Sequence, residues 1–264
     1  MNYILFDNFN RNYLLPLSFT RPVADIRVGI MTVRQKWEHY LGVETSTLTE
    51  DYLSVKHPIV KGEDNILING TVLPNKALIE EIGKIGINQA LVKGDVIIAI
   101  TLTSSDLDNI DDTEGMEEME TDVDFEKITY TWDIFMANDS AIRRDYEFLT
   151  KDRKSAPLSK TNTLIGKDLF IEEGARVEAA SINTETGPVY IGKDAEIMEG
   201  SAIRGPFALC HNSTVKMNAK IYGATTVGPF SKVGGELNNV VIFGYSNKAH
   251  DGFLGNAVIG EWCN

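Results

Sequence analysis

The chain has few of the residues from which disulfides and metal centres are built, with two cysteines and four histidines among 264 residues. Cys210 and Cys263 cannot form a disulfide framework, and no metal-ligand spacing surrounds them. Only His211 and His250 lie in the last hundred residues. The sequence therefore predicts neither a disulfide-stapled scaffold nor a resident metal centre.

Long apolar runs are also missing. No stretch approaches the ~18 apolar residues that a membrane-spanning helix needs. The first seven residues, MNYILFD, lack the basic start and long apolar core of a signal peptide and instead resemble a buried strand. We expect a cytoplasmic protein that does not enter a membrane.

Basic residues are outnumbered, 25 against 38 acidic residues, for a net charge of −13. This balance argues against a nucleic acid partner, because phosphate binding needs clustered Lys and Arg. The excess is concentrated in residues 104–126, which contain eleven acids and no base. This acidic segment is either a lid or partner-binding segment, or a solvated and partly disordered excursion.

The sequence does contain a repeat of aliphatic residues at a spacing of six. Neither an α-helix nor a flat strand needs that period, but a parallel β-helix of hexapeptide repeats does. Each hexad then supplies one short strand and one corner, with the aliphatic side chain inside. The repeat positions are Ile165, Ile171, Val177, Ile191, Ile197, Ile203, Leu209, Val215, Ile221, Val227 and Val233.

The repeat is broken twice. Val177 and Ile191 are fourteen residues apart, and Val233 and Phe253 are twenty apart. Each break predicts an insertion that bulges from a corner, because the strands must stay in register. The second break lies beside residues 246–250, and loops on a rigid scaffold commonly carry binding residues.

Residues 1–150 show no hexads and alternate between strand and helix patterns, which predicts an α/β domain. A polar linker over 151–163 then leads to the β-helix of 164–264. The chain stops in the middle of a repeat, so we expect that the β-helix is truncated at its C-terminus. Within the first domain the patterns predict strands at 4–6 and 65–69, helices at 29–41, 76–85 and 131–150, and a hairpin over 90–100.

Two segments carry a resemblance to a known family. Residues 15–22, LPLSFTRP, are similar to a stretch after the first strand of sugar-phosphate nucleotidyltransferases, and residues 250–260, HDGFLGNAVIG, resemble their acetyltransferase half. The chain resembles the GlmU-like bifunctional enzymes, in a divergent subgroup. The resemblance implies a Rossmann-like nucleotidyltransferase domain, a left-handed β-helix, and a role in the biosynthesis of sugar nucleotides of the UDP-N-acetylglucosamine type.

Against the family pattern, the nucleotidyl site looks degraded. Residues 7–12 contain no glycine, although the family's triphosphate loop is glycine-rich. Tyr13 and Val23 stand where the family has cations. Arg21 remains, as a phosphate or sugar ligand or as part of a structural salt bridge. Asn69 is either a substrate ligand or a turn residue, and the Thr71 that follows it is a poor ligand for the Mg²⁺ that the resemblance implies.

The acetyltransferase half retains more of the family's residues. His250 matches the catalytic base, which would deprotonate the substrate amine as acetyl-CoA donates its acetyl group. Phe253 replaces a Tyr that contacts the sugar phosphate, and Lys248 is near enough to replace a phosphate-binding Lys. Asn264 matches an Asn that binds the sugar or the acyl donor. His211 is expected to be structural.

Three hypotheses follow. The chain is a transferase that uses a sugar 1-phosphate, acetyl-CoA and a nucleoside triphosphate, or it is a non-catalytic relative that binds sugar phosphates as a regulator or scaffold. A zinc enzyme of the γ-carbonic anhydrase kind is the third, but it would need three converging histidines. By analogy with other hexapeptide proteins we expect a homotrimer.

Overall fold

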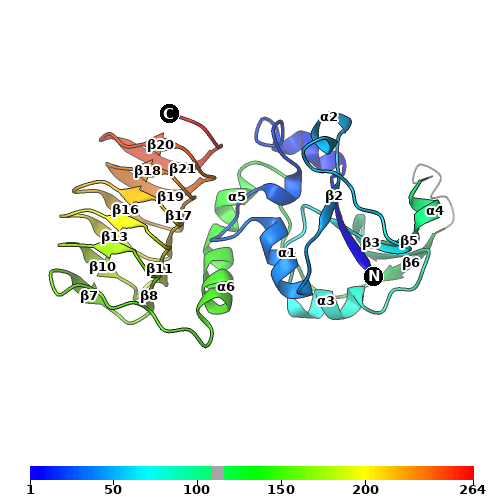
Figure 1. Ribbon diagram of the computed structural model, residues 1–264, viewed down its shortest axis with the longest axis horizontal. Helices are drawn as coiled ribbons and strands as arrows, with labels where there is room; N and C mark the ends of the chain where they lie inside the picture. Colours follow the sequence, from blue (N-terminus) through cyan, green and yellow to red (C-terminus); the bar gives the residue numbers. More distant parts are fainter. Residues whose placement is uncertain (109–115) are drawn as a thin grey trace. The chain divides into compact units, whose positions relative to one another are not determined.

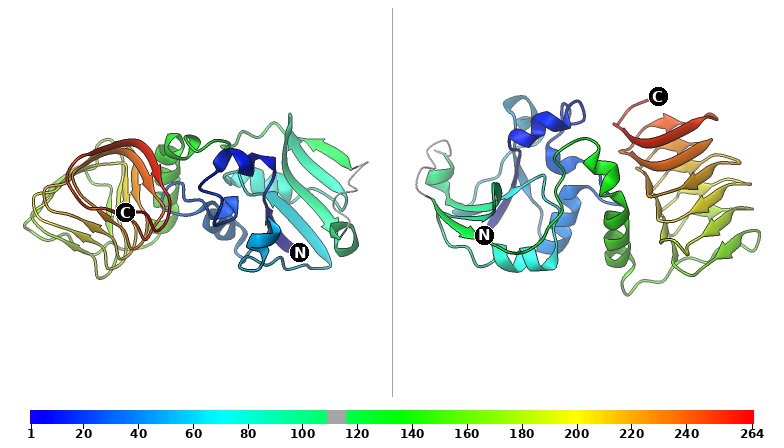
Figure 2. Two further views of the ribbon diagram at one scale, coloured as in Figure 1. Left: turned by 90° about the horizontal axis from the view of Figure 1, so that it is seen from above. Right: turned by 180° about the vertical axis from the view of Figure 1, so that it is seen from behind.

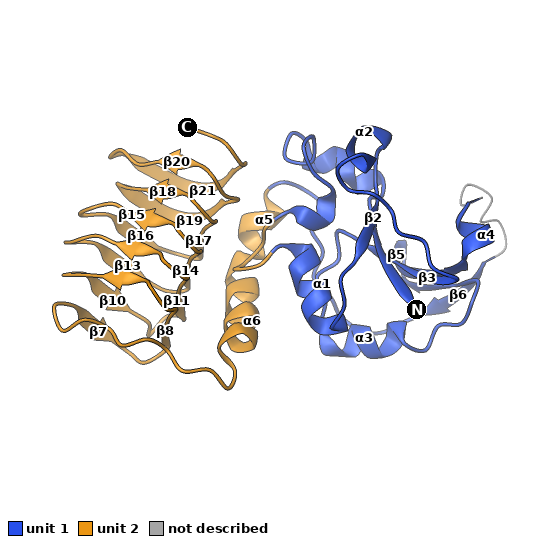
Figure 3. Ribbon diagram, viewed as in Figure 1, with its two compact units in different colours: residues 1–26, 32–131 blue, residues 27–31, 132–264 orange. Residues whose placement is uncertain are grey.

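The computed structural model describes residues 1–108 and 116–264 (Figures 1 and 2). Two compact units account for them, coloured separately in Figure 3. Unit 1 comprises residues 1–26 and 32–131, and unit 2 comprises residues 27–31 and 132–264. The predicted fold class, an α/β domain followed by a parallel β-helix, is confirmed. The predicted domain boundary at residue 150 follows the last helix, whereas the compact units divide the chain after residue 131.

Unit 1 is built on a mixed six-stranded sheet in the order β2-β1-β3-β5-β4-β6. Strands β1, β2 and β3 run parallel to one another, and β5 is antiparallel to both β3 and β4, as the predicted hairpin requires. The strands are β1 (Asn2–Phe6), β2 (Ser46–Leu48), β3 (Asp64–Asn69), β4 (Gln89–Lys93), β5 (Val96–Thr103) and β6 (Glu117–Glu120).

The helical elements of unit 1 are short. They are η1 (Phe9–Leu14), η2 (Val23–Asp25), α1 (Val33–Leu41), α2 (Asp51–Ser54), α3 (Lys76–Ile82) and α4 (Ser104–Leu107). Helix α1 begins later than predicted. Thr32 caps it, with the Thr32 hydroxyl accepting from the Gln35 backbone N–H and the Gln35 side chain accepting from the Thr32 backbone N–H. Gly42, at φ 71°, ends it.

The acidic segment contains more regular structure than its composition predicts. Its described parts include α4 and the edge strand β6, which pairs in parallel with β4. Three glutamates on β6 disfavour the pairing of a further strand with this edge, because charged side chains oppose edge-to-edge association. Residues 109–115, the middle of the predicted lid or excursion, lie outside the described residues.

Unit 2 contains the parallel β-solenoid, whose coils supply three columns of strands. One column is a five-stranded sheet, and the other two share the strands β19 and β21. The first column comprises β8 (Leu169–Ile171), β11 (Val189–Ile191), β14 (Phe207–Leu209) and β17 (Thr225–Val227); the second β9 (Arg176–Val177), β12 (Glu196–Ile197), β15 (Thr214–Val215), β18 (Lys232–Val233) and β20 (Asn247–Lys248); the third β7 (Thr163–Ile165), β10 (Ser181–Asn183), β13 (Ala202–Arg204) and β16 (Lys220–Tyr222). β19 (Glu236–Ile242) and β21 (Phe253–Ile259) serve the first and third columns together.

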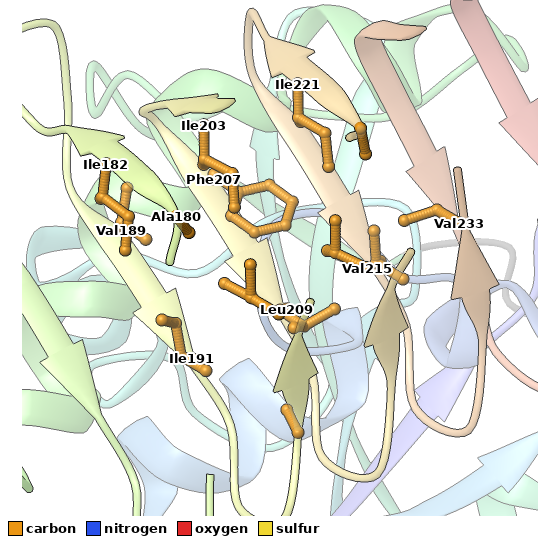
Figure 4. Packing of buried hydrophobic residues seen from close by; sticks show 14 of the residues in the cluster. Ala180, Ile182, Val189, Ile191, Ile203, Phe207, Leu209, Val215, Ile221 and Val233 are labelled. Atoms are coloured by element: carbon orange, nitrogen blue, oxygen red, sulfur yellow. The ribbon is translucent and has the colours of Figure 1, made fainter. Parts of the chain in front are cut away.

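The hexad residues fill the solenoid interior, as Figure 4 shows. All of the predicted repeat positions belong to this core except Ile165, which is 44% exposed on the first strand. Phe253 is not an interior position either, because Leu254 is the residue in register with Leu237. Phe253 is 64% exposed.

The two breaks in the repeat differ physically. The first is an insertion, as predicted, and residues 184–188 form the longer corner between β10 and β11. The second is a shortening. Val227 and Ile242 are in register although only fifteen residues separate them. The turn between β18 and β19 is two residues shorter than the turn between β15 and β16, and β19 passes through the next corner without a loop. The prediction of an inserted loop at the second break was wrong.

The predicted linker caps the N-terminal end of the solenoid. Ala156 and Leu158 pack against its core, and the Ala156 N–H donates to the Ile171 carbonyl over 2.8 Å. The Asn162 side chain donates to the Val177 carbonyl and accepts from the Ala180 N–H. An uncovered apolar cross-section is costly for a solenoid, so these polar residues have a structural role.

Helix α6 (Asn138–Thr150), which follows α5 (Asp133–Met136), packs on the first column of strands. The outward residues of that column include the small Ala208, Cys210 and Ala224, which leave room for the helix. Asn138 is fully buried, and its side-chain N–H donates to the Ala224 carbonyl over 2.9 Å.

Residues 27–31 form a strap across this helix. The backbone N–H groups of Ile30 and Met31 donate to the Asp145 carboxylate, over 2.7 and 3.0 Å. Gly29 must be glycine, because its φ is 78° and a Cβ there would lie 2.5 Å from that carboxylate. These bonds explain why α1 does not begin at residue 29.

No helix among the described residues is long and apolar enough to cross a membrane.

We expect Ile191→Ala to lower the free energy of unfolding by about 2–5 kcal/mol, since Ile191 is fully buried and the change leaves a cavity. The exposed Ile165→Ala is the matched control and should cost about 0.5 kcal/mol or less. Urea unfolding measures both. Equal losses of unfolding free energy in the two variants would contradict the assignment of Ile191 to the solenoid interior and of Ile165 to the surface.

An acid-sensitive contact joins the cap to the solenoid. Arg153 makes two hydrogen bonds to the Glu172 carboxylate, of 2.9 and 2.6 Å, and the Tyr190 hydroxyl donates a third. Burial raises the pKa of Glu172, but these hydrogen bonds outweigh burial and hold the pKa below its usual value. The stabilisation is thus present above the unfolded pKa and is lost as the pH falls through the folded pKa.

We expect Glu172→Gln to be destabilising at pH 7 and to lose less stability than the wild type between pH 5 and pH 3. Glu173→Gln, at the exposed neighbouring position, is the control. Thermal unfolding across that pH range gives the comparison, and identical acid profiles for wild type and Glu172→Gln would rule the contact out as a source of acid sensitivity.

Candidate functional site

The carboxyl ends of β1, β2 and β3 lie side by side at one edge of the unit 1 sheet. In open α/β sheets ligands bind outside these ends, where neighbouring strands connect in opposite directions. A hollow of about 420 Å³ occurs there, between the segments that follow β1 and β2. Its lining includes Asp7, Phe9, Arg11, Thr49, Glu50 and Asp51.

Asp7 is the first residue after β1 and is held by its neighbours. One carboxylate oxygen accepts from the Val23 N–H over 2.8 Å, and the other accepts from the Thr49 hydroxyl over 2.6 Å. Burial raises the pKa of Asp7, although the Thr49 hydrogen bond opposes that shift. The carboxylate thereby ties the start of η2 and the segment after β2 to the end of β1.

Arg11 lies on η1 and is only 5% exposed. Its Nη2 donates to the Ser18 carbonyl and to the Tyr52 hydroxyl, over 2.6 and 2.5 Å, and its Nε lies 3.4 Å from the Asp7 carboxylate. Nε makes no hydrogen bond within the described chain, and Nη1 has no acceptor there. A guanidinium that lines a hollow with donors unused is equipped to bind an anion.

The predicted site residues of unit 1, Arg21 and Asn69, are buried and lie outside the lining of the hollow. Arg21 is 8% exposed, its Nη2 lies 3.4 Å from the Thr20 hydroxyl, and it does not line the hollow. Asn69 is buried and its amide makes three protein hydrogen bonds, one to the Ile97 carbonyl and two from Thr71. Ligand binding by Arg21 and Asn69 stays a prediction.

The donors at this edge do not fit a resident Mg²⁺. The Asn69 amide oxygen and both Asp7 oxygens are already used by protein N–H and O–H groups. Nowhere in residues 1–108 and 116–264 do three His, Cys, Asp or Glu side chains gather as a metal site requires. No step of the chemistry is therefore assigned to a metal ion held by these residues.

The second candidate site is the loop between β20 and β21 in unit 2. Lys248 occupies the register position of the interior Val233, and its ammonium turns back to the loop. It donates to three carbonyls, those of Gly234, His250 and Gly252, over 3.0, 2.6 and 3.2 Å. All three N–H donors of Lys248 are used, so its role in the structure is to hold the loop that presents His250.

The other predicted residues of this site lie on the surface nearby in the chain. His250 and Asn264 are exposed. The Phe253 ring folds over Gly255, where a Cβ would lie 2.5 Å from the ring. Lys248 and His250 are thus brought together through the loop backbone, while Arg21 and Asn69 belong to the other unit.

With this geometry in place, comparison with known proteins identifies the family. The model of the family described as "Sugar nucleotidyl transferase" matches residues 3–154. The chain belongs to this sugar nucleotidyltransferase family. The match includes unit 1 from residue 3 onward, the strap and α6, and it ends before the first strand of the solenoid. No curated protein matches the chain.

Membership of the sugar nucleotidyltransferase family supports a function of that type, and the hollow lies inside the matched residues. Thr49, Glu50 and Asp51 were not among the predicted site residues, because the short strand β2 before them has no apolar alternation to reveal it. Arg11 was not among the predicted site residues either. Its position four residues after Asp7, on a helical turn, was the available signal.

We expect Lys248→Met to loosen the loop of residues 249–252, because three carbonyls would lose their common donor. Hydrogen exchange of the loop amides should rise at least tenfold. Lys232→Met, an exposed lysine on the adjacent coil, should leave exchange unchanged. Unchanged exchange in Lys248→Met would show that the ammonium does not organise the loop.

Proposed function

We propose that unit 1 transfers a nucleotidyl group from a nucleoside triphosphate to a sugar 1-phosphate, in the biosynthesis of a sugar nucleotide of the UDP-N-acetylglucosamine type. The observation that carries the proposal is the family match across the residues that form the hollow. The position of the hollow, at the carboxyl ends of parallel strands, supports it independently.

In this reaction an oxygen of the sugar phosphate attacks the α-phosphorus of the triphosphate. The bond from that phosphorus to the bridging oxygen breaks, and pyrophosphate leaves. Negative charge grows on the leaving group, and a fixed guanidinium stabilises it without reorganisation. We assign this role to Arg11, because Tyr52 and Ser18 already fix its Nη2.

A cluster of exposed aromatic rings extends from the hollow. Phe9 packs edge-on against Tyr13 at 5.4 Å, and Tyr13 lies 5.3 Å from Tyr130. Of these rings, Phe9 lies in the segment of residues 7–12 that replaces the family's glycine-rich loop. We infer that the base of the nucleotide stacks on them, since every base has a face that an aromatic side chain can cover.

A second candidate function is acetyl transfer from acetyl-CoA to an amino-sugar phosphate, with His250 as the base. The specific support is the exposed imidazole on a loop fixed by Lys248. In this proposal the protein is a GlmU-like enzyme and a homotrimer, with acetyl sites between neighbouring solenoids. Unlike the first proposal, it places the chemistry outside the residues that the family model matches.

A non-catalytic sugar-phosphate-binding regulator or scaffold is the alternative. The glycine-free segment after β1 and the engaged Asn69 amide favour it. A measurement of turnover distinguishes an enzyme from a non-catalytic regulator or scaffold. The full chain is incubated with nucleoside triphosphates, several sugar 1-phosphates and Mg²⁺, and separately with acetyl-CoA and amino-sugar phosphates. If neither assay shows turnover and the chain binds sugar phosphate saturably, the protein is a non-catalytic regulator or scaffold.

We expect Arg11→Gln to lower kcat/KM for nucleotidyl transfer by about 10²-fold, the usual cost of removing one fixed donor from developing charge. Tyr52→Phe, which removes one partner of Arg11 but keeps its charge, should retain most activity. Initial rates of pyrophosphate release measure both. If Arg11→Gln were as active as Tyr52→Phe, the assignment of Arg11 would be wrong.

We expect His250→Ala to abolish acetyl transfer and to leave nucleotidyl transfer within about twofold of the wild type, because the two reactions use different units. Release of free CoA thiol and of pyrophosphate measures the two activities separately. If the His250→Ala variant still transferred acetyl groups, His250 would not be the base of that reaction.

A further inference from the structure

The hollow of unit 1 is lined almost entirely by polar side chains. Seven of its nine lining residues are polar or charged, and only Phe9 and Leu48 are apolar. One wall comes from within residues 7–12, after β1, and the other from residues 48–51, at the end of β2 and after it. The volume of about 420 Å³ falls within the ~300–1,000 Å³ of small-molecule sites. The hollow therefore suits a small polar ligand.

The wall after β1 contains a charge pair with hydrogen-bonding capacity left over. The Arg11 Nε lies 3.4 Å from the Asp7 carboxylate, so the two charges compensate each other. Arg11 is only 5% exposed and lines the hollow, yet its Nε makes no hydrogen bond. A ligand group that enters the hollow can complete these hydrogen bonds, and phosphoryl oxygens are strong acceptors for a guanidinium. This wall is equipped to receive a phosphoryl group.

The wall after β2 carries two adjacent carboxylates that have no partner. Glu50 and Asp51 are exposed, and their side chains make no hydrogen bond or ion pair with the described part of the chain. Glu50 occupies the N-cap position of α2, but its side chain does not cap the helix. Arg11 is the one cation among the lining residues, and Asp7 already compensates its charge. Two negative charges are therefore unbalanced at this wall.

The unbalanced charge limits which ligand fits the hollow. Nucleotidyl transfer brings phosphates to this site, and unpaired carboxylates repel them. An ionised carboxylate only accepts hydrogen bonds, whereas an ammonium group only donates them and carries the opposite charge. An ammonium group at this wall therefore satisfies the carboxylates and offsets their repulsion of the phosphates. A sugar hydroxyl also donates, but it leaves the charge unbalanced.

Two amide side chains in the wall after β1 match the other groups of a sugar. Asn8 and Asn12 both line the hollow. The Asn8 Oδ1 accepts from the Asn10 N–H over 3.0 Å, and the Asn8 amide N–H groups make no hydrogen bond to the described residues. The Asn12 side chain is exposed and also makes none. An amide offers both donors and an acceptor, which is what a ring of hydroxyls requires.

We propose that the acceptor of unit 1 is a sugar 1-phosphate with a free ammonium group, which Glu50 and Asp51 bind while the phosphoryl groups face Arg11. Asn8 and Asn12 bind hydroxyls of the same sugar. The inference rests on the nucleotidyl transfer proposed above and specifies its acceptor. An N-acetyl group has no positive charge, so acetylation of the sugar would follow nucleotidyl transfer rather than precede it. The two carboxylates determine specificity and take no part in making or breaking bonds.

The test compares glucosamine 1-phosphate, N-acetylglucosamine 1-phosphate and glucose 1-phosphate with the full chain. Pyrophosphate release in the presence of a nucleoside triphosphate and Mg²⁺ gives kcat/KM, and calorimetry gives binding. We expect glucosamine 1-phosphate to be preferred about tenfold over both others, since one exposed ion pair strengthens binding about threefold and two are formed. Glucose 1-phosphate isolates the charge, because it lacks the bulk of the acetyl group. The preference should shrink to about twofold in about 0.5 M salt, which screens exposed charges.

The double variant Glu50→Gln, Asp51→Asn keeps the shape of the wall and removes its charge. We expect kcat/KM for glucosamine 1-phosphate to fall about tenfold and kcat/KM for glucose 1-phosphate to stay the same or rise. Thermal midpoints should not change, because both side chains are exposed. Glu44→Gln is the control, at an exposed position before β2 and outside the lining of the hollow, and should keep the full preference.

Three outcomes would overturn this inference while nucleotidyl transfer stands. They are equal kcat/KM values for the three sugars in the wild type, a preference that survives in the double variant, and an equal loss for all three sugars in that variant. The last would show that the two carboxylates act on the triphosphate and its Mg²⁺. The absence of pyrophosphate release with every sugar 1-phosphate would instead overturn the proposed nucleotidyl transfer, and the preference for an ammonium group would then be judged from binding alone.

Discussion

The architecture of unit 2 depends on the register of its interior column. Each coil must place an aliphatic side chain directly above the one before, because neighbouring parallel strands share one ladder of hydrogen bonds. Once Ile191, Leu209 and Val227 point inward, the strand residue beside each must point outward. The same register therefore determines the small outward residues beneath α6.

The hexad spacing predicted this fold because the interior residue repeats along the chain itself. It could not predict the end of the solenoid, where β19 removes a corner and Leu254, not Phe253, takes the interior position. The spacing of aliphatic residues along the chain predicts the strand register only where successive coils contain the same number of residues. In unit 1, β2 and η1 were missed for a related reason: both are short, and the contacts of Asp7 and Arg11 that stabilise them come from distant residues.

For the candidate sites, the sequence identified which residue types are present. It did not show whether their polar groups are already used in hydrogen bonds within the chain. The motif around His250 predicted a catalytic base, which stays a prediction, and the structure places this residue on an exposed loop. Lys248 and Asn69 were predicted as ligands, yet hydrogen bonds within the chain occupy their polar groups. A motif records which residue is present, whereas the free donors that bind a ligand depend on partners far away in the chain. Arg11 shows the opposite outcome, with donors left over after its structural bonds are made.

The strap of residues 27–31 has a consequence for how this chain can be divided. It is synthesised before most of unit 1 but belongs to unit 2, so neither unit is a continuous piece of polypeptide. A fragment that begins at residue 132 would retain the Asp145 carboxylate without the two N–H groups that it accepts from. Its α6 would also lose the contact of Ile30 with the helix and the strands beneath. The strap must therefore wait for a helix that is synthesised more than a hundred positions later, and unit 2 is completed by a segment that interrupts the sequence of unit 1.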